Sequence, residues 1–124
     1  MRDMKNNVDA VTSINPAAQT ATVNGAGVDL RGFESAMVVF HPGTIADGTH
    51  TPKIQESDDN SAFTDVAADQ QGTLTALASN TVQRVGYIGS KRYIRAVSTV
   101  AGATTGGVYG ALVLRGSPNI APAA

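Results

Sequence analysis

Short runs of alternating apolar and polar residues recur along this chain, and each run ends within a few residues at glycine, proline, asparagine or aspartate. Side chains of a β-strand point alternately to its two faces, so a period of two over about 4–8 residues predicts a half-buried strand. The runs lie at residues 8–14, 19–24, 28–30, 35–40, 53–57, 63–66, 81–88, 93–100 and 108–114. About eight strands, with 28–30 as a short edge piece, predict an all-β protein. The expected architecture is an antiparallel β-sandwich, with the jelly roll as one topology that fits.

The most continuously apolar run, residues 35–40 (Ser-Ala-Met-Val-Val-Phe), predicts a central strand that is buried on both faces. His41-Pro42-Gly43 follows it and is expected to end it, since proline cannot donate to a strand ladder. For the same reason Asn15-Pro16 is expected to end the first strand. The last strand is expected to be central as well.

Two hairpins are predicted. Residues 53–57 and 63–66 flank the polar tip Asp58-Asp59-Asn60-Ser61, whose side chains favour turns. Residues 81–88 and 93–100 are joined by a short connection at 89–92, which indicates a second hairpin. Between the hairpins, residues 67–79 mix loop and helix signals and predict a loop with one helical turn.

The chain has 124 residues and predicts a single domain over 1–124. It has no cysteine, which excludes disulfides and thiolate metal sites. Nine basic and ten acidic residues leave a net charge of −1, and the basic residues are scattered, so nucleic acid is not an expected partner. No apolar run reaches the ~18 residues of a membrane span, and the polar start lacks the apolar core of a signal peptide. Neither a membrane nor export is expected.

Both ends are predicted to be flexible arms, polar over residues 1–7 and rich in proline and alanine over residues 117–124. Segments of this composition are disordered by themselves or become ordered when they bind a partner.

Two groups of residues are candidate chemical sites. His41, Asp47 and His50 lie in or beside one loop, but their spacing matches no zinc pattern, and a loop role is favoured. The acidic residues Glu56, Asp58, Asp59 and Asp65 could attract a hard cation, although the turn chemistry of a hairpin tip also explains them. Cation binding there is left open.

Signatures of catalysis are lacking in the sequence. The chain has no Gly-x-Ser-x-Gly turn and no phosphate loop. The expectation is therefore a protein without catalytic residues, metal or cofactor.

Three segments together resemble small virion proteins of tailed bacteriophages: the apolar run 35–40, the hairpin 53–66 and the strand start Lys91-Arg92-Tyr93-Ile94-Arg95. The resemblance extends over residues 8–116. It implies a β-sandwich capsid decoration (cement) protein that binds the major capsid protein on the capsid exterior. It further implies a homotrimer that is made in the host cytoplasm. No catalytic residue comes with the resemblance.

On this resemblance either the N-terminal arm or the tail of residues 117–124 grips the shell. The arm is favoured because Arg2, Lys5 and its two asparagines can hydrogen-bond a shell surface. The candidate contact residues are Arg2, Met4, Lys5, Asn6, Asn7 and Val8. Two alternatives remain open. One is a tail or head–tail component of the virion, and the other is a β-sandwich that binds a host glycan through tyrosines such as Tyr87, Tyr93 and Tyr109.

Overall fold

The computed structural model describes residues 4–118, which form nine strands and one 3-10 turn. The elements are β1 (Val8–Gln19), β2 (Val23–Asn24), β3 (Val28–Asp29), β4 (Phe33–Ile45), β5 (Thr49–Ser57), β6 (Thr64–Asp65), η1 (Ala68–Gln70), β7 (Gln83–Tyr87), β8 (Tyr93–Ala101) and β9 (Gly107–Pro118). In this range no helix is long and apolar enough to cross a membrane.

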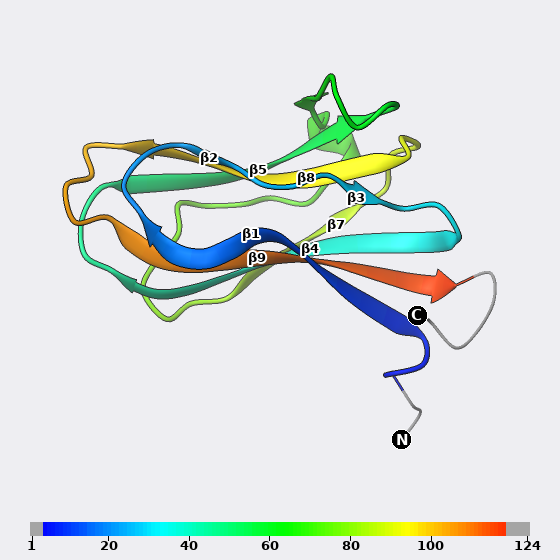
Figure 1. Cartoon of the computed structure of the whole chain (residues 1–124), viewed down its shortest axis with the longest axis horizontal. Coiled ribbons are helices and arrows are strands. Elements are labelled where there is room, and N and C mark those ends of the chain that lie inside the picture. Colours follow the sequence, from blue (N-terminus) through cyan, green and yellow to red (C-terminus); the bar gives the residue numbers. More distant parts are fainter. Residues whose placement is uncertain (1–3, 119–124) are drawn as a thin grey trace.

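The strands form two sheets that lie face to face (Figure 1). One sheet has the order β1-β9-β4-β7, and the other has the order β2-β8-β5-β6, with β3 also paired to β8. Every strand pairing is antiparallel. The predicted antiparallel β-sandwich is therefore confirmed.

The pairing follows the jelly-roll pattern. Strand β1 pairs with β9, β2 and β3 pair with β8, β4 pairs with β7, and β5 pairs with β6. If β2 and β3 are counted as one interrupted strand, the sandwich has eight strands in the described residues. The first then pairs with the eighth, the second with the seventh, the third with the sixth and the fourth with the fifth. Such a chain is one long hairpin rolled into two sheets. This topology puts β9 between β1 and β4, so the last strand is central, as predicted.

The core lies between the two sheets. Val38 of β4 and Val113 of β9 face Ile54 of β5 and Ile94 of β8 across it, and all four side chains are fully buried. Burying one such side chain stabilises a fold by about 1.5–3 kcal/mol. Aliphatic side chains with few aromatic ones suffice to fill this space.

The expectation that residues 35–40 are buried on both faces is wrong. Val38 and Phe40 are fully buried, whereas Met37 and Val39, which point to the other side of β4, are partly exposed. Full burial is therefore confined to the side of β4 that faces the other sheet.

Neither proline ends its strand. β4 continues through Pro42, which is buried opposite Tyr109, and a register shift between Pro42 and Ile45 accommodates it. β1 continues past Pro16 to Gln19 through two register shifts on either side of Ile14. Bulges let a strand bypass a residue that cannot donate a ladder hydrogen bond.

One predicted hairpin forms and the other does not. β5 and β6 pair through Gln55 with Asp65 and Glu56 with Thr64, as predicted. β7 and β8 lie in different sheets, so residues 88–92 cross between the layers instead of closing a hairpin. The single helical turn expected within residues 67–79 is η1.

The first strand begins at the predicted residue, and the C-terminal tail is shorter than predicted. Val8 is the first residue of β1 and pairs with Gly116, while residues 4–7 form a turn in which Asn7 N–H donates to the Met4 carbonyl at 3.1 Å. At the other end β9 reaches Pro118, so the first two residues of the predicted tail belong to the sheet. Arg2 and residues 119–124 lie outside the described residues.

Candidate interaction surface

The outer face of the β2-β8-β5-β6 sheet is polar. Lys53 and Asp65 form an ion pair at 3.1 Å, and the Gln55 side chain donates to Asp65 at 2.9 Å. Arg95 in turn donates to Oε1 of the Gln55 side chain at 2.6 and 2.9 Å. A network of this kind, between long polar side chains on neighbouring strands, is typical of a solvent-facing sheet.

The outer face of the β1-β9-β4-β7 sheet is apolar. On its central strand β9, Tyr109 and Val113 point into the core, so the alternate residues Val108 and Leu112 point outward, where they are 47% and 38% exposed. Leu112 pairs with Val39 on one side and with Thr12 on the other. We call this surface the apolar face, and its residues are Ala10, Thr12, Met37, Val39, Val108, Leu112 and Leu114.

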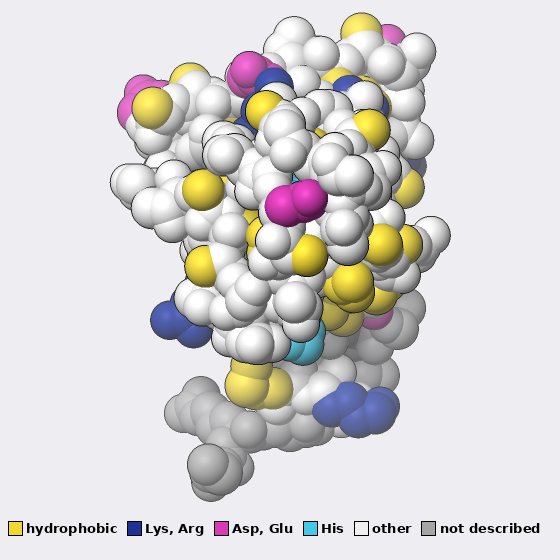
Figure 2. Space-filling model, turned by 90° about the vertical axis from the view of Figure 1, so that its left-hand side faces the viewer, with side chains coloured by type: hydrophobic (Ala, Val, Ile, Leu, Met, Phe, Trp, Pro, Cys, Tyr) yellow, Lys and Arg dark blue, Asp and Glu magenta, His cyan; other side chains and the backbone are white. Residues whose placement is uncertain are grey.

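Two shallow hollows lie along the apolar face. One has a volume of about 330 Å³ and is bordered by Thr12, Val108 and Leu112. The other has a volume of about 280 Å³ and is bordered by Met37 and Leu114. Figure 2, which looks onto one end of the sandwich, shows hydrophobic side chains exposed at several places, with basic and acidic side chains scattered among them.

In the described parts of its four strands, the outer side of the β1-β9-β4-β7 sheet carries one charged side chain, Arg84, and one imidazole, His41. Arg84 of β7 lies opposite Val39 and is exposed, and exposed His41 of β4 has the same outward orientation. The described parts of these four strands contain two carboxylates, Asp9 and Glu34. Both stand in phase with the inward-facing residues of their strands, not with the outward-facing ones. A partner with apolar groups and acidic groups beside them would complement this surface.

Part of the predicted N-terminal arm lies at the apolar face. Met4, which is 70% exposed, and Val8 both border the hollow of about 280 Å³. Lys5, Asn6 and Asn7 form the turn between them. The arm and the apolar face therefore make one continuous surface in the described residues.

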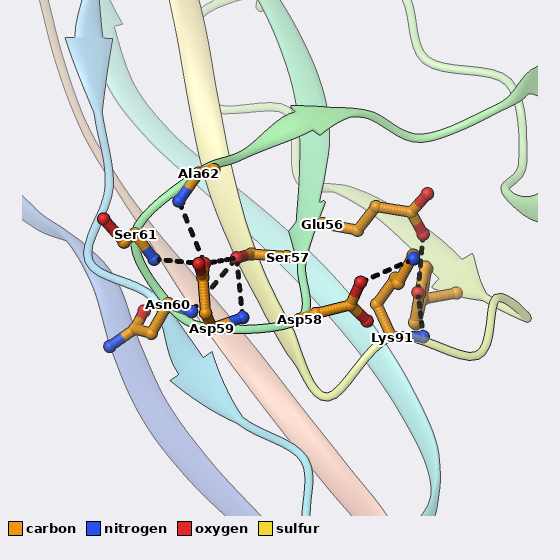
Figure 3. A network of polar contacts seen from close by, with 9 residues as sticks. Glu56, Ser57, Asp58, Asp59, Asn60, Ser61, Ala62 and Lys91 are labelled. Atoms are coloured by element: carbon orange, nitrogen blue, oxygen red, sulfur yellow. Dashed lines mark hydrogen bonds and ion pairs between the residues drawn. The ribbon is translucent and has the colours of Figure 1, made fainter.

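The acidic hairpin tip is held by internal contacts (Figure 3). The Asp59 carboxylate accepts hydrogen bonds from the N–H groups of Ala62 and Ser61, both at 3.0 Å, and these bonds lower its pKa. Asp58 forms an ion pair with Lys91 at 2.8 Å. Glu56 accepts from the Tyr87 hydroxyl at 2.7 Å, and burial together with this bond raises the pKa of Tyr87 to about 12.

Each of these carboxylates therefore contacts a different partner. The fourth, Asp65, forms an ion pair with Lys53 and accepts a hydrogen bond from the Gln55 side chain. Within residues 4–118 no three histidine or acidic side chains are grouped so that they could hold a metal ion. The turn hydrogen bonds and ion pairs of this hairpin are sufficient to explain why its residues are acidic.

The two histidines lie in different sheets and have different surroundings. His50 is buried and hydrogen-bonded through Nδ1 to the Tyr109 hydroxyl at 2.9 Å and through Nε2 to the Asp47 carbonyl at 3.0 Å. His41 is exposed on the outer side of the other sheet. The Asp47 carboxylate accepts N–H groups of Thr104, Thr105 and Gly106 instead of facing a ligand.

Each aromatic side chain is either buried in the fold or covered by an arginine. The buried ones are Phe40, Tyr87 and Tyr109. An arginine lies over each of the others: Arg115 over Phe33 at 4.5 Å, Arg95 over Phe63 at 4.1 Å and Arg92 over Tyr93 at 5.1 Å. The described residues thus give the glycan-binding alternative no uncovered aromatic platform.

The fold and this surface define a jelly-roll sandwich with one polar and one apolar outer face. No protein-family model matches the chain, and no curated protein shows a significant match to its sequence. Its function must therefore be argued from its own surface.

Proposed function

We propose that this protein is a non-catalytic structural virion protein that binds the outer surface of a phage capsid and stabilises it, as decoration (cement) proteins do. The observation that carries the proposal is the apolar face. An antiparallel sheet with one exposed side normally alternates apolar inward and polar outward residues. The β1-β9-β4-β7 sheet instead exposes Val108 and Leu112 at its centre, and a contiguous apolar patch marks a surface that binds another protein.

The polar clusters of the sandwich support a structural role. Asp59 and Asp47 accept backbone N–H groups and thereby hold the hairpin tip and the β8–β9 loop. His50 is enclosed in the core by Tyr109 and Asp47. Each cluster stabilises a connection between strands, so we assign the protein to assembly and not to catalysis.

The resemblance of residues 35–40 and 53–66 to small phage virion proteins supports the location on the capsid, with the major capsid protein as partner. On this proposal the apolar face lies against the shell. Met4 and Val8 border the same face, so the N-terminal segment would contact the shell together with the sheet. Several weak contacts made at once hold a protein far more tightly than each contact alone.

Co-sedimentation with capsids that lack the protein tests the proposal. Wild-type protein is expected to pellet with capsids and to raise their thermal stability. Leu112→Lys puts a charge at the centre of the apolar face and is expected to abolish both effects. The matched control is Thr99→Lys, which adds the same charge to an exposed position of β8 on the polar face and is expected to bind normally.

Equal binding of Leu112→Lys and Thr99→Lys would show that the apolar face does not contact the shell. Binding of the wild-type protein to purified tails but not to capsids would reject the decoration role in favour of a tail role. Deletion of residues 1–7 is expected to weaken capsid binding without unfolding the sandwich, since the deleted segment precedes β1.

A further inference from the structure

Three of the four edges of the two sheets are covered or short in the described residues. At the β7 edge, Gln71 forms a bridge with Tyr87. At the same edge the Gln83 side chain bonds the backbone of Thr75 on both its N–H and its carbonyl, at 3.1 and 3.0 Å. The segment before β7 therefore occupies the hydrogen-bonding positions that a further strand would need.

The edges of the second sheet are short. β6 has two residues, and β2 and β3 have two residues each. Between β2 and β3 the chain turns inward, where Gly25 N–H donates to the Ala96 carbonyl and Ala26 N–H donates to the Ser13 carbonyl, both at 2.7 Å. Short and interrupted edges of this kind protect a sheet from pairing with another chain.

The β1 edge is different. From Val8 opposite Gly116 to Thr12 opposite Leu112 its pairing with β9 is continuous, and the register shifts begin only after Thr12. No backbone hydrogen bond joins residues 8–12 to any described segment other than β9. In Figure 1 this part of β1 runs at the border of the sandwich, away from the second sheet. Because alternate residues of a strand turn their N–H and carbonyl groups to opposite sides, this edge presents unpaired donors and acceptors.

The usual protections of an edge strand are absent from residues 8–12. They contain no lysine, no proline and no bulge. Their one charged side chain, Asp9, is bound to Arg115 of the neighbouring strand β9, and both side chains are less than one-fifth exposed. The edge is thus extended, regular and nearly uncharged.

We propose that residues 8–12 of β1 pair antiparallel with the same residues of a second copy, which joins the two β1-β9-β4-β7 sheets into one continuous sheet. Pairing centred on Ala10 places Val8 opposite Thr12 and Asp9 opposite Val11, so no like charges meet across the strands. A second copy is therefore complementary to this edge without any change in either chain.

The contact would be two-fold, because the same edge is used by both partners. A trimer built edge to edge would instead need β1 of one copy to meet the β7 edge of the next, and that edge is occupied by residues 71–77. Ala10 and Thr12 also belong to the apolar face, so pairing makes the apolar faces of two copies continuous. The proposal stands on the strand edge and does not require that the face bind a capsid.

Cysteine cross-linking tests the pairing and its register, since the chain has no cysteine of its own. Residues directly opposite in an antiparallel pair have Cα atoms about 4.5–5.5 Å apart, within the range that a disulfide spans. Ala10→Cys is expected to form a disulfide-linked dimer under mild oxidation. Ala18→Cys, exposed on the same strand beyond the register shifts, is expected to stay monomeric. Equal cross-linking of both variants, or of neither, would overturn the proposal.

Light scattering over a concentration series provides a second test. The wild-type mass is expected to double as concentration rises. Ala10→Lys, which places two ammonium groups opposite each other, is expected to keep the monomer mass, whereas Ala10→Val and Leu112→Lys should still dimerise. A wild-type protein that stays monomeric throughout, or an Ala10→Lys variant that dimerises normally, would overturn the pairing.

The same variants separate this proposal from the capsid role. Leu112→Lys should lose capsid binding while it keeps the dimer, so failure of one proposal leaves the other measurable. Cross-linking of Ala10→Cys to a capsid protein but not to a second copy would assign the edge to the shell and overturn self-pairing.

Discussion

The hydroxyl oxygen of Tyr109 lies 2.9 Å from Nδ1 of His50, and the two rings meet edge to face with centroids 5.2 Å apart inside the sandwich. Ser98 Oγ lies 2.8 Å from the same hydroxyl. One residue from each of β5, β8 and β9 thus joins the two sheets through a buried polar network. Buried polar groups stabilise a fold only while every partner is present.

Removal of the Tyr109 hydroxyl should therefore destabilise the protein. Tyr109→Phe leaves Nδ1 of buried His50 without its partner, and we expect the free energy of unfolding in urea to fall by about 1–3 kcal/mol. Tyr93→Phe is the control, because Tyr93 lies at the start of β8 and is partly exposed. Its effect should stay within about 0.5 kcal/mol. Equal losses in the two variants would contradict a special role for the buried network.

Gly25 should not tolerate a side chain. A Cβ atom there would overlap Ser13 Oγ and lie 2.6 Å from the Ala96 carbonyl oxygen, so Gly25→Ala must shift the contact between β1 and β8. We expect a loss of about 1–3 kcal/mol in thermal or urea unfolding. Gly86→Ala is the matched control, since no atom lies within 4 Å of its added Cβ. It should be neutral or stabilising, as alanine is favoured over glycine in a strand by about 0.5–1 kcal/mol. A smaller loss for Gly25→Ala than for Gly86→Ala would refute this.

Asp29 should make part of the stability depend on acid pH. Two hydrogen bonds from Arg92, at 2.8 and 2.9 Å, lower the pKa of Asp29 from 3.8 to about 2. The folded state therefore favours the charged carboxylate. Its stabilisation is fully present above pH 3.8 and is lost as pH falls through about 2.

Asp29→Asn should lower stability at pH 7, by about 1 kcal/mol or less because the pair is partly exposed. The difference from wild type should shrink between pH 4 and pH 2 and also in high salt. Urea unfolding at several pH values measures it, with Asp69→Asn, an exposed residue of η1, as control. A difference that persists unchanged at pH 2 would rule out the ion pair as its cause.

Asp47 should control the order of the β8–β9 loop. Its carboxylate accepts N–H groups of Gly106 at 2.6 Å and of Thr104 and Thr105, and these bonds lower its pKa. Asp47→Ala is expected to speed amide hydrogen exchange at these three residues. Asp47→Asn, which retains one acceptor oxygen, should have a smaller effect. Unchanged exchange in Asp47→Ala would show that the loop is held by other contacts.

The strand pattern could be predicted because it is local. Alternation along residues 93–100 reflects the two faces of a single strand, and the tip between β5 and β6 depends on side chains that bond their own backbone. The positions of Pro16 and Pro42 could not be predicted from local rules. Both lie within strands, where bulges compensate for the missing donor, and a bulge depends on the partner strand β9.

The candidate surface was predicted only in part. The sequence predicts that the N-terminal segment takes part in binding, and Met4 and Val8 of this segment border the apolar face. Val108 and Leu112, at the centre of that face, lie on a strand that the sequence correctly predicts to be central, but a central position in the sheet does not say whether the outer side of the strand is covered. An apolar residue on a strand can face a core or an open surface, and its alternation alone does not distinguish the two.

The sequence by itself determined that this protein is built from β-strands, that its turns lie at glycine, asparagine and aspartate, and that its core is aliphatic, because these properties follow from the residues within each strand. Only the tertiary structure decided that β7 and β8 belong to different sheets, that one outer face is polar and the other apolar, and that no other segment in the range 4–118 pairs with the outer edge of residues 8–12. These properties depend on which distant strands pair, and pairing is set by the packing of the whole sandwich.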